Sequence, residues 1–255
     1  MAKQLWKPGN ILNPVPVVMV SVADEKGKAN IITVAWAGTI CTNPPMVSIS
    51  VRPSRFSYDL IRRSGEFVIN LTTKDLVKAC DYCGVVSGRD VDKFQKMNLT
   101  PLPMEHVKAP GIAESPVNIE CKVTEIQPLG SHTMFVAEVV GVVVEDAYMD
   151  ESGRFGINET GLVVYSHGEY FALGEKLGKF GYSVKKSERR LRTQKHKTNN
   201  EHKIQWTSRY WSRMSIKYAY TSSFCFFQLP QMASACSLVR TDRVRSRTGF
   251  SSERI

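Results

Sequence analysis

Two arginines and two serines lie within six residues, in the run Arg52-Pro53-Ser54-Arg55-Phe56-Ser57. The run follows residues 46–51, where apolar and polar residues alternate as in a strand, and it precedes a predicted short helix over 57–63. Backbone N–H groups at a helix N-terminus bind anions, and hydroxyl and guanidinium groups strengthen such a site. An ordinary serine-capped helix with solvated arginines is the alternative. The run therefore predicts either an anion site or a plain helix start.

A second group of small and polar residues lies one strand earlier. Residues 37–45 are expected to form a loop, and their small side chains would let the backbone approach a flat ligand closely. Asn30, Thr33 and Thr39 add amide and hydroxyl groups at a strand end and in this loop. Together the two groups resemble a site for a planar ring that is followed by a site for a phosphate.

The elements that must position these residues are mostly short strands. Turn residues separate segments of alternating or continuous apolar character, and only two short helices interrupt them. This pattern favours a mainly β fold, an antiparallel barrel with a few flanking helices. A Gly-x-Gly-x-x-Gly turn between strand and helix is missing, which argues against a classical dinucleotide fold. The predicted strands are 15–22, 30–36, 46–51, 65–71, 117–128, 132–146, 162–165 and 170–173, and the predicted helices are 57–63 and 74–81.

Charge divides the chain into two unlike parts. The whole chain of 255 residues has a formal net charge of +10. Residues 187–255 contain 14 Lys and Arg against 4 Asp and Glu, whereas residues 1–186 contain 20 of each and have no net charge. We therefore expect a globular domain over 1–186 and a basic tail over 187–255. Only the tail has the charge that would drive binding to nucleic acid.

The tail has two interpretations. Its scattered arginines and aromatic residues could form an arm that binds nucleic acid. Alternatively, it has no evolved fold, for example as a read-through or out-of-frame extension, and is unstructured. We favour the second interpretation, because one Gly and one Pro in 69 residues provide almost no turns and no periodicity persists.

The cysteines and the apolar segments indicate a compartment. The chain has six Cys, no run of 18 apolar residues and no apolar stretch near Met1, so we expect neither a membrane span nor a signal peptide. A reducing, cytoplasmic location follows from this pattern. Cys80 and Cys83 could form a redox pair or half a zinc site, but a second ligand pair is missing nearby. We favour two reduced thiols on a helix and expect no metal site.

Several motifs in order resemble the flavin reductase-like family of FMN-binding split barrels, including its flavoredoxin-type members. The resemblance covers almost all of residues 1–186, and family chains usually end near the position of Lys186. It implies an antiparallel, Greek-key-like split barrel. The motifs are Ala29-Asn30-Ile31-Ile32-Thr33-Val34-Ala35-Trp36, Ser54-Arg55-Phe56-Ser57, Ser87-Gly88-Arg89-Asp90-Val91-Asp92-Lys93-Phe94, Gly130-Ser131-His132 and Tyr165-x-x-Gly168-x-Tyr170.

The resemblance also implies roles for individual residues. Residues that line the isoalloxazine ring and ribityl chain would be Asn30, Thr33, Ala35, Trp36, Thr39, Ile40 and Cys41. Residues that hold the FMN phosphate would be Arg52, Ser54, Arg55 and Ser57, with Lys93 at the cofactor edge. His132 would stand where the nicotinamide stacks. The family commonly has Gly-Asp-His at this last site, whereas this chain has Ser131 in place of the carboxylate.

The function implied is an FMN-binding oxidoreductase that takes reducing equivalents from NADH or NADPH. Hydride transfer between these cofactors requires no protein nucleophile, because the chemistry belongs to the cofactors. A flavoredoxin-type protein that exchanges electrons with a redox protein partner, without NAD(P)H, is the first alternative. Nucleic-acid binding through the tail is the second. The resemblance further implies a homodimer with its flavin sites at or near the interface.

We predict that truncation after Lys186 leaves flavin binding and thermal stability nearly unchanged, because every recognised motif precedes that residue. Thermal unfolding and a flavin fluorescence titration of the truncated and full-length chains measure both properties. A truncated chain that fails to fold would show that the tail has a structural role.

Overall fold

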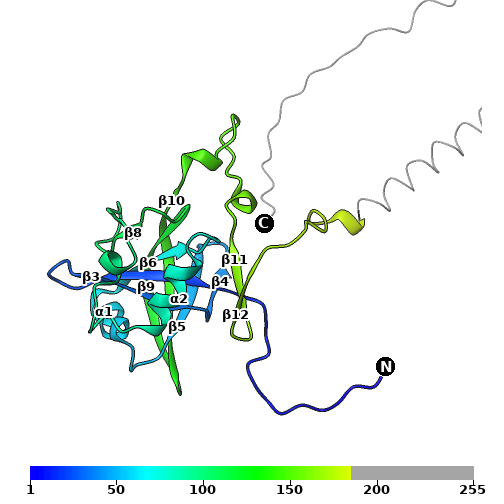
Figure 1. Cartoon of the computed structure of the whole chain (residues 1–255), viewed down its shortest axis with the longest axis horizontal. Coiled ribbons are helices and arrows are strands. Elements are labelled where there is room, and N and C mark those ends of the chain that lie inside the picture. The colour runs from blue at the N-terminus through cyan, green and yellow to red at the C-terminus, as the bar shows by residue number, and fades with distance from the viewer. Residues whose placement is uncertain (185–255) are drawn as a thin grey trace, which may run out of the picture. The chain divides into compact units, whose positions relative to one another are not determined.

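The structure is a computed structural model that describes residues 1–184 (Figure 1). The predicted basic tail, 187–255, lies outside the described residues, so the structure tests neither interpretation of it. A first compact unit spans Met1–Glu175 and contains all named helices and strands. The domain boundary after Lys186 stays a prediction.

Seven strands form one antiparallel sheet that carries most of the fold. Strands β2 and β3 pair as a hairpin, as do β9 and β10, whereas β6 joins β2 to β9 and β10 pairs with the earlier β5. These pairings between strands distant in sequence give the sheet a Greek-key-like connectivity. Spatial order is β3 (Ala29–Val34), β2 (Val18–Ala23), β6 (Glu66–Leu71), β9 (Val117–Leu129), β10 (His132–Val144), β5 (Met46–Val51) and β4 (Ala37–Cys41).

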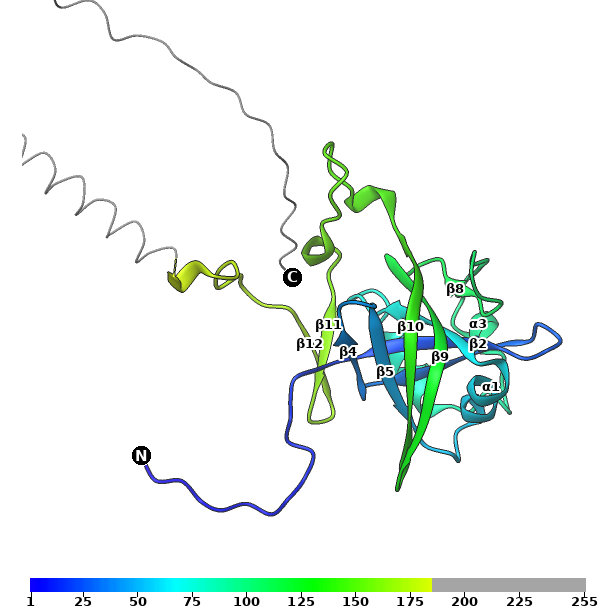
Figure 2. The ribbon, with the colours of Figure 1, turned by 180° about the vertical axis from the view of Figure 1, so that it is seen from behind.

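The remaining elements are short. Three helices connect strands of the main sheet: α1 (Phe56–Ser64), α2 (Val77–Val85) and α3 (Lys93–Lys96). A three-stranded sheet combines β1 (Val15–Pro16), β11 (Val163–Ser166) and β12 (Glu169–Ala172), and β7 (Pro101–Leu102) pairs with β8 (Gly111–Ile112). Two 3₁₀ turns, Asp146–Tyr148 and Ile157–Glu159, lie between β10 and β11 (Figure 2). Among the described residues, no helix is long and apolar enough to cross a membrane.

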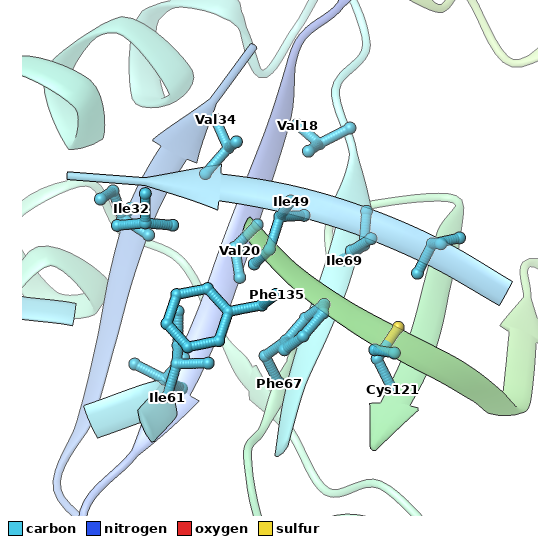
Figure 3. Packing of buried hydrophobic residues seen from close by; sticks show 14 of the residues in the cluster. Val18, Val20, Ile32, Val34, Ile49, Ile61, Phe67, Ile69, Cys121 and Phe135 are labelled. Atoms are coloured by element: carbon cyan, nitrogen blue, oxygen red, sulfur yellow. The ribbon is translucent and has the colours of Figure 1, made fainter. Parts of the chain in front are cut away.

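The main core fills the curve of the seven-stranded sheet. Phe67 of β6 and Phe135 of β10 are fully buried and point into the same apolar interior as Ile49 of β5 and Ile61 of α1 (Figure 3). Alternation explains this burial, because Val47, Ile49 and Val51 are buried while Ser48 and Ser50 between them are half-buried. Burial of apolar area of this kind is the dominant favourable term in folding.

A polar cluster inside the protein links β6, β9 and the β8 hairpin. Asn70 donates to the carbonyl of Met19 (2.9 Å) and accepts from the Ile112 N–H (2.9 Å) and from the Asn118 amide (2.7 Å). All of these side chains and backbone groups are buried. Buried polar groups of this kind are tolerated because each finds a partner.

The predicted mainly β, antiparallel split-barrel fold is confirmed, with local differences. The predicted strand 15–22 is interrupted at Val17, and α3, β7 and β8 were not predicted. Residues 37–41 form strand β4, although their small side chains had suggested a loop throughout. Backbone pairing with β5 along an edge of the sheet makes them a strand, and pairing depends little on side chains. Helix α2 begins at Val77 and ends at Val85, later than the predicted 74–81, and it continues through Gly84.

Candidate functional site

The Arg and Ser run forms the start of helix α1. The Arg55 N–H donates to the carbonyl of Arg52 (3.0 Å), which closes a turn, and Arg55 is the N-cap residue of the helix. No side chain caps this N-terminus, so the serine-capped alternative is wrong. At the other end, Gly65 adopts the left-handed conformation (φ 68°) that commonly terminates a helix. The uncapped N–H groups of α1 are therefore available to an anion.

Ser57 of α1 is held in place by a buried side-chain amide from strand β3. The Asn30 side chain donates to the Ser57 hydroxyl at 2.7 Å, and both residues are almost fully buried. Gly88 packs directly against this pair, because a Cβ atom at residue 88 would lie 2.0 Å from the Asn30 Oδ1. A side chain at this position would have to displace Asn30, so glycine allows the close approach of the 86–90 segment to β3.

Lys93 places a buried ammonium in the same region as Asn30, Ser57 and Gly88. Its Nζ donates to the carbonyls of Ile31 and Cys83, each at 2.7 Å, and the residue is 3% exposed. Burial lowers the pKa of Lys93, the Cys83 thiol opposes this shift, and the positive charge of Arg55 adds to it. Arg55 and Lys93 line the same hollow, so two cations lie close together here.

These residues surround a first hollow of about 120 Å³ between β3, the start of α1 and the end of α2. Among the described residues, no Asp or Glu side chain lines it. Arg89 contributes a further cation, and its guanidinium lies 5.5 Å from the centre of the Phe56 ring. The predicted site residues in this hollow are Asn30, Ser54, Arg55, Ser57 and Lys93.

A second hollow of about 150 Å³ adjoins the first, and Ile32 and Arg55 line both. Here the chain passes from β3 toward β4, opposite the end of β5 and the start of β10. No carboxylate lines this hollow in the described part of the chain either. The predicted site residues in it are Thr33, Ala35, Trp36, Arg52, Arg55 and His132.

His132 begins β10 and is half-buried in the second hollow. The Ser131 hydroxyl lies 2.9 Å from its Nδ1, so this serine is the partner of the ring. Burial lowers the pKa of His132, and the nearby Arg52 guanidinium lowers it further. The imidazole is therefore neutral at neutral pH, since the unshifted value is about 6.5.

Three predicted residues lie elsewhere. Thr39, Ile40 and Cys41 belong to edge strand β4 and line neither hollow. Ile40 is 50% exposed, so this edge presents an apolar side chain to its surroundings. Their proposed contact with a flavin ring remains a prediction.

Sequence reasoning did not assign Ser50, Ser87, Gly88 or Arg89 to the site, although they line the hollows. Ser87-Gly88-Arg89 had been noted only as a family motif. A small-residue pair beside an arginine, directly after a helix, is the signal that could have identified this segment as part of a candidate anion site.

Cys80 and Cys83 both lie on α2, as predicted, and both are free and buried. Burial raises the pKa of the Cys83 thiol to about 11 and also raises that of Cys80. Thiols of this kind are poor nucleophiles, because the thiolate is the reactive form. The Cys80 carbonyl accepts a hydrogen bond from the Thr33 hydroxyl, so α2 also helps to orient β3. Among residues 1–184, no group of three or more metal-ligating side chains is present.

We predict that Gly88→Ala displaces the Asn30 side chain and costs about 1–3 kcal/mol of stability, as overpacking of a well-packed site does. Gly174→Ala is the matched control, because a Cβ there meets nothing within 4 Å. Urea denaturation measures both variants. Equal midpoints would contradict the close approach of Gly88 to Asn30.

Residues 12–174 match the protein family described as flavin reductase like domain. A solved flavoredoxin of Desulfovibrio vulgaris (Miyazaki F) is 32% identical, with 72% of this chain and all of that chain covered and a TM-score of 0.67. An FMN-binding protein from Thermus thermophilus is 26% identical, with 70% and 98% covered and a TM-score of 0.58. An uncharacterized protein of Archaeoglobus fulgidus is 33% identical over 144 residues, which cover 56% of this chain and 80% of that relative. The chain therefore belongs to the flavin reductase-like family, as a split-barrel member of the flavoredoxin type.

Proposed function

We propose that this protein binds FMN in the two adjoining hollows and passes reducing equivalents from NADH or NADPH to an acceptor. Membership of the flavin reductase-like family supports a flavin as the cofactor. The phosphate of FMN is the part that the cationic first hollow would recognise. The neutral domain has no net charge that would favour nucleic acid instead.

The observation that carries the proposal is the buried ammonium of Lys93. Between residues 1 and 184, the one ion pair within 4 Å joins Arg62 to Asp59 on the surface, so no carboxylate neutralises Lys93. A buried charge without a counterion costs several kcal/mol. Two carbonyls satisfy two of its three N–H donors, and Lys93 also lines the first hollow. A phosphate in that hollow would supply the missing negative charge.

The residues present fit a phosphate at this end of the site. The N-terminus of α1 offers backbone N–H groups, and Ser54, Ser57 and Arg55 add hydroxyl and guanidinium donors. The second hollow is lined partly by apolar side chains, among them Trp36, and a planar ring would lie there. We therefore assign the phosphate end of FMN to the first hollow and its ring to the second.

The role of the protein would be to bind and orient the flavin. The chemistry that a bound flavin would supply is acceptance of a hydride from a reduced nicotinamide and transfer of the electrons to an acceptor. Arg55, Ser57 and Lys93 anchor the phosphate and thereby fix the position of the ring. Neutral His132 borders the second hollow, on the side from which the nicotinamide donor would approach the ring. No protein nucleophile is required.

We further propose that the protein is a homodimer and that it works in the cytoplasm. The two hollows together are smaller than the ~300 Å³ at which ligand pockets usually begin. A second copy would cover the exposed side of the ring, and exposed Ile40 at the β4 edge offers it an apolar contact.

Electron transfer without NAD(P)H is the second candidate, and the similarity to a solved flavoredoxin favours it. In that case a redox protein partner would deliver or accept the electrons. We expect NADH or NADPH oxidation when donor and FMN are mixed with the protein. Anaerobic and aerobic assays follow the loss of absorbance of the reduced nicotinamide. Absence of turnover under both conditions would leave the electron-transfer candidate in place of the reductase.

We predict that Arg55→Ala weakens FMN binding about tenfold, because one charge-assisted hydrogen bond contributes about 1.5–3 kcal/mol and Arg55 is exposed. Riboflavin, which has no phosphate, should bind the variant and the unaltered protein equally. Arg62→Ala, an exposed arginine of α1 that lines neither hollow, is the control. Fluorescence titration measures all three proteins. An equal loss of riboflavin binding would contradict the phosphate assignment.

A further inference from the structure

The site contains more positive charge than one flavin phosphate requires. Three basic side chains line the first hollow, Arg55, Arg89 and Lys93, and Arg52 and His132 lie in the second. No carboxylate among the described residues lines either hollow, and none of these five side chains belongs to the ion pair found there. One phosphate carries at most two negative charges and would face the α1 N-terminus, Arg55 and Lys93. Among the described residues, Arg52 in the second hollow is then left without a counterion.

Arg52 shares the second hollow with Arg55, but it does not line the first hollow with Ser54, although it is only two residues away from it. It follows directly after β5, and β5 pairs with β10 so that Val51 is opposite Thr133. This register places Arg52 beside His132, and both residues line the second hollow. Arg52 does not line the first hollow, where Ser54, Ser57 and Lys93 converge. The resemblance had grouped Arg52 with those phosphate residues, and the geometry separates it from them.

We infer that Arg52, which is exposed, and half-buried His132 form a second anion subsite at the rim of the second hollow, beside the flavin ring, and that this subsite takes a phosphate group of the nicotinamide dinucleotide donor. This inference rests on the proposed function. The donor brings a pyrophosphate, and NADPH brings a 2′-phosphate as well. A guanidinium matches the geometry of phosphate oxygens.

His132 supports the same assignment through its partner. Where the Ser131 hydroxyl donates to Nδ1 (2.9 Å), the proton of the neutral ring is on Nε2 and can be donated to an anion oxygen. Ser131 thus takes the place of the family's carboxylate without adding a negative charge that would repel a phosphate. Arg52 supplies the permanent charge, and His132 supplies a directed hydrogen bond.

The subsite is tested with ADP, which has the pyrophosphate of the donor and no nicotinamide. Isothermal titration measures ADP binding to the full-length, FMN-loaded protein, to Arg52→Gln and to Arg62→Gln as the control. We expect Arg52→Gln to weaken ADP binding about tenfold, the loss of one charge-assisted hydrogen bond, while Arg62→Gln binds like the unaltered protein. A parallel titration with 2′-phosphorylated ADP shows whether the pyrophosphate or the 2′-phosphate occupies the subsite.

Two further measurements separate this inference from the proposed function. FMN affinity of Arg52→Gln should stay within twofold of the unaltered protein, and the KM for the donor should rise while kcat stays nearly constant. Loss of FMN binding in Arg52→Gln, with ADP binding unchanged, would return Arg52 to the flavin phosphate and overturn the inference. ADP binding that is equal in all three proteins would also overturn it. Failure of the proposed function would instead appear as absence of FMN binding by the unaltered protein.

Discussion

The ammonium of Lys93 is the interaction on which the site depends. It joins the carbonyl of Ile31 on β3 to that of Cys83 near the end of α2, so one buried charge fixes the strand, the helix and its own short helix α3. A buried ammonium that lost these bonds would be strongly unfavourable, so the three elements are held at this spacing. Its third donor is left for a ligand in the first hollow. The same group therefore organises the structure and provides the charge that an anion would meet.

Close backbone contact then brings the remaining groups together. Gly88 allows the segment after α2 to touch Asn30, and Asn30 in turn orients Ser57 at the start of α1. The Thr33 hydroxyl adds a bond from β3 to the Cys80 carbonyl of α2. With these contacts, a strand, two helix ends and a turn surround one small volume. The buried amide of Asn30 and the hydroxyls of Ser57 and Thr33 each have a hydrogen-bond partner, as buried polar groups usually do.

Charge is distributed over the domain in a way that the net value conceals. Residues 1–186 are neutral overall, yet three arginines and Lys93 gather around the two hollows without a carboxylate among the described lining residues. A local excess of one sign attracts a ligand of the opposite sign, whatever the total charge of the domain. The two hollows share Arg55, so a phosphate in the first and a second anion at the rim of the other would lie on either side of a common cation.

Local patterns in the sequence determined most strands, because alternation is read over a few residues: apolar and polar residues alternate over 46–51, and Val47, Ile49 and Val51 are the buried face of that strand. The order of motifs identified the family, and the Arg and Ser run located the start of α1. Only the tertiary structure decided which residues meet. Lys93 is 62 residues from Ile31, and strand register alone places Arg52 beside His132 rather than beside Ser57. Strand β4 was missed because backbone pairing with a neighbour, and not the side chains of residues 37–41, makes it a strand. Secondary structure follows from local periodicity, whereas a binding site is made of contacts between segments that only folding brings together.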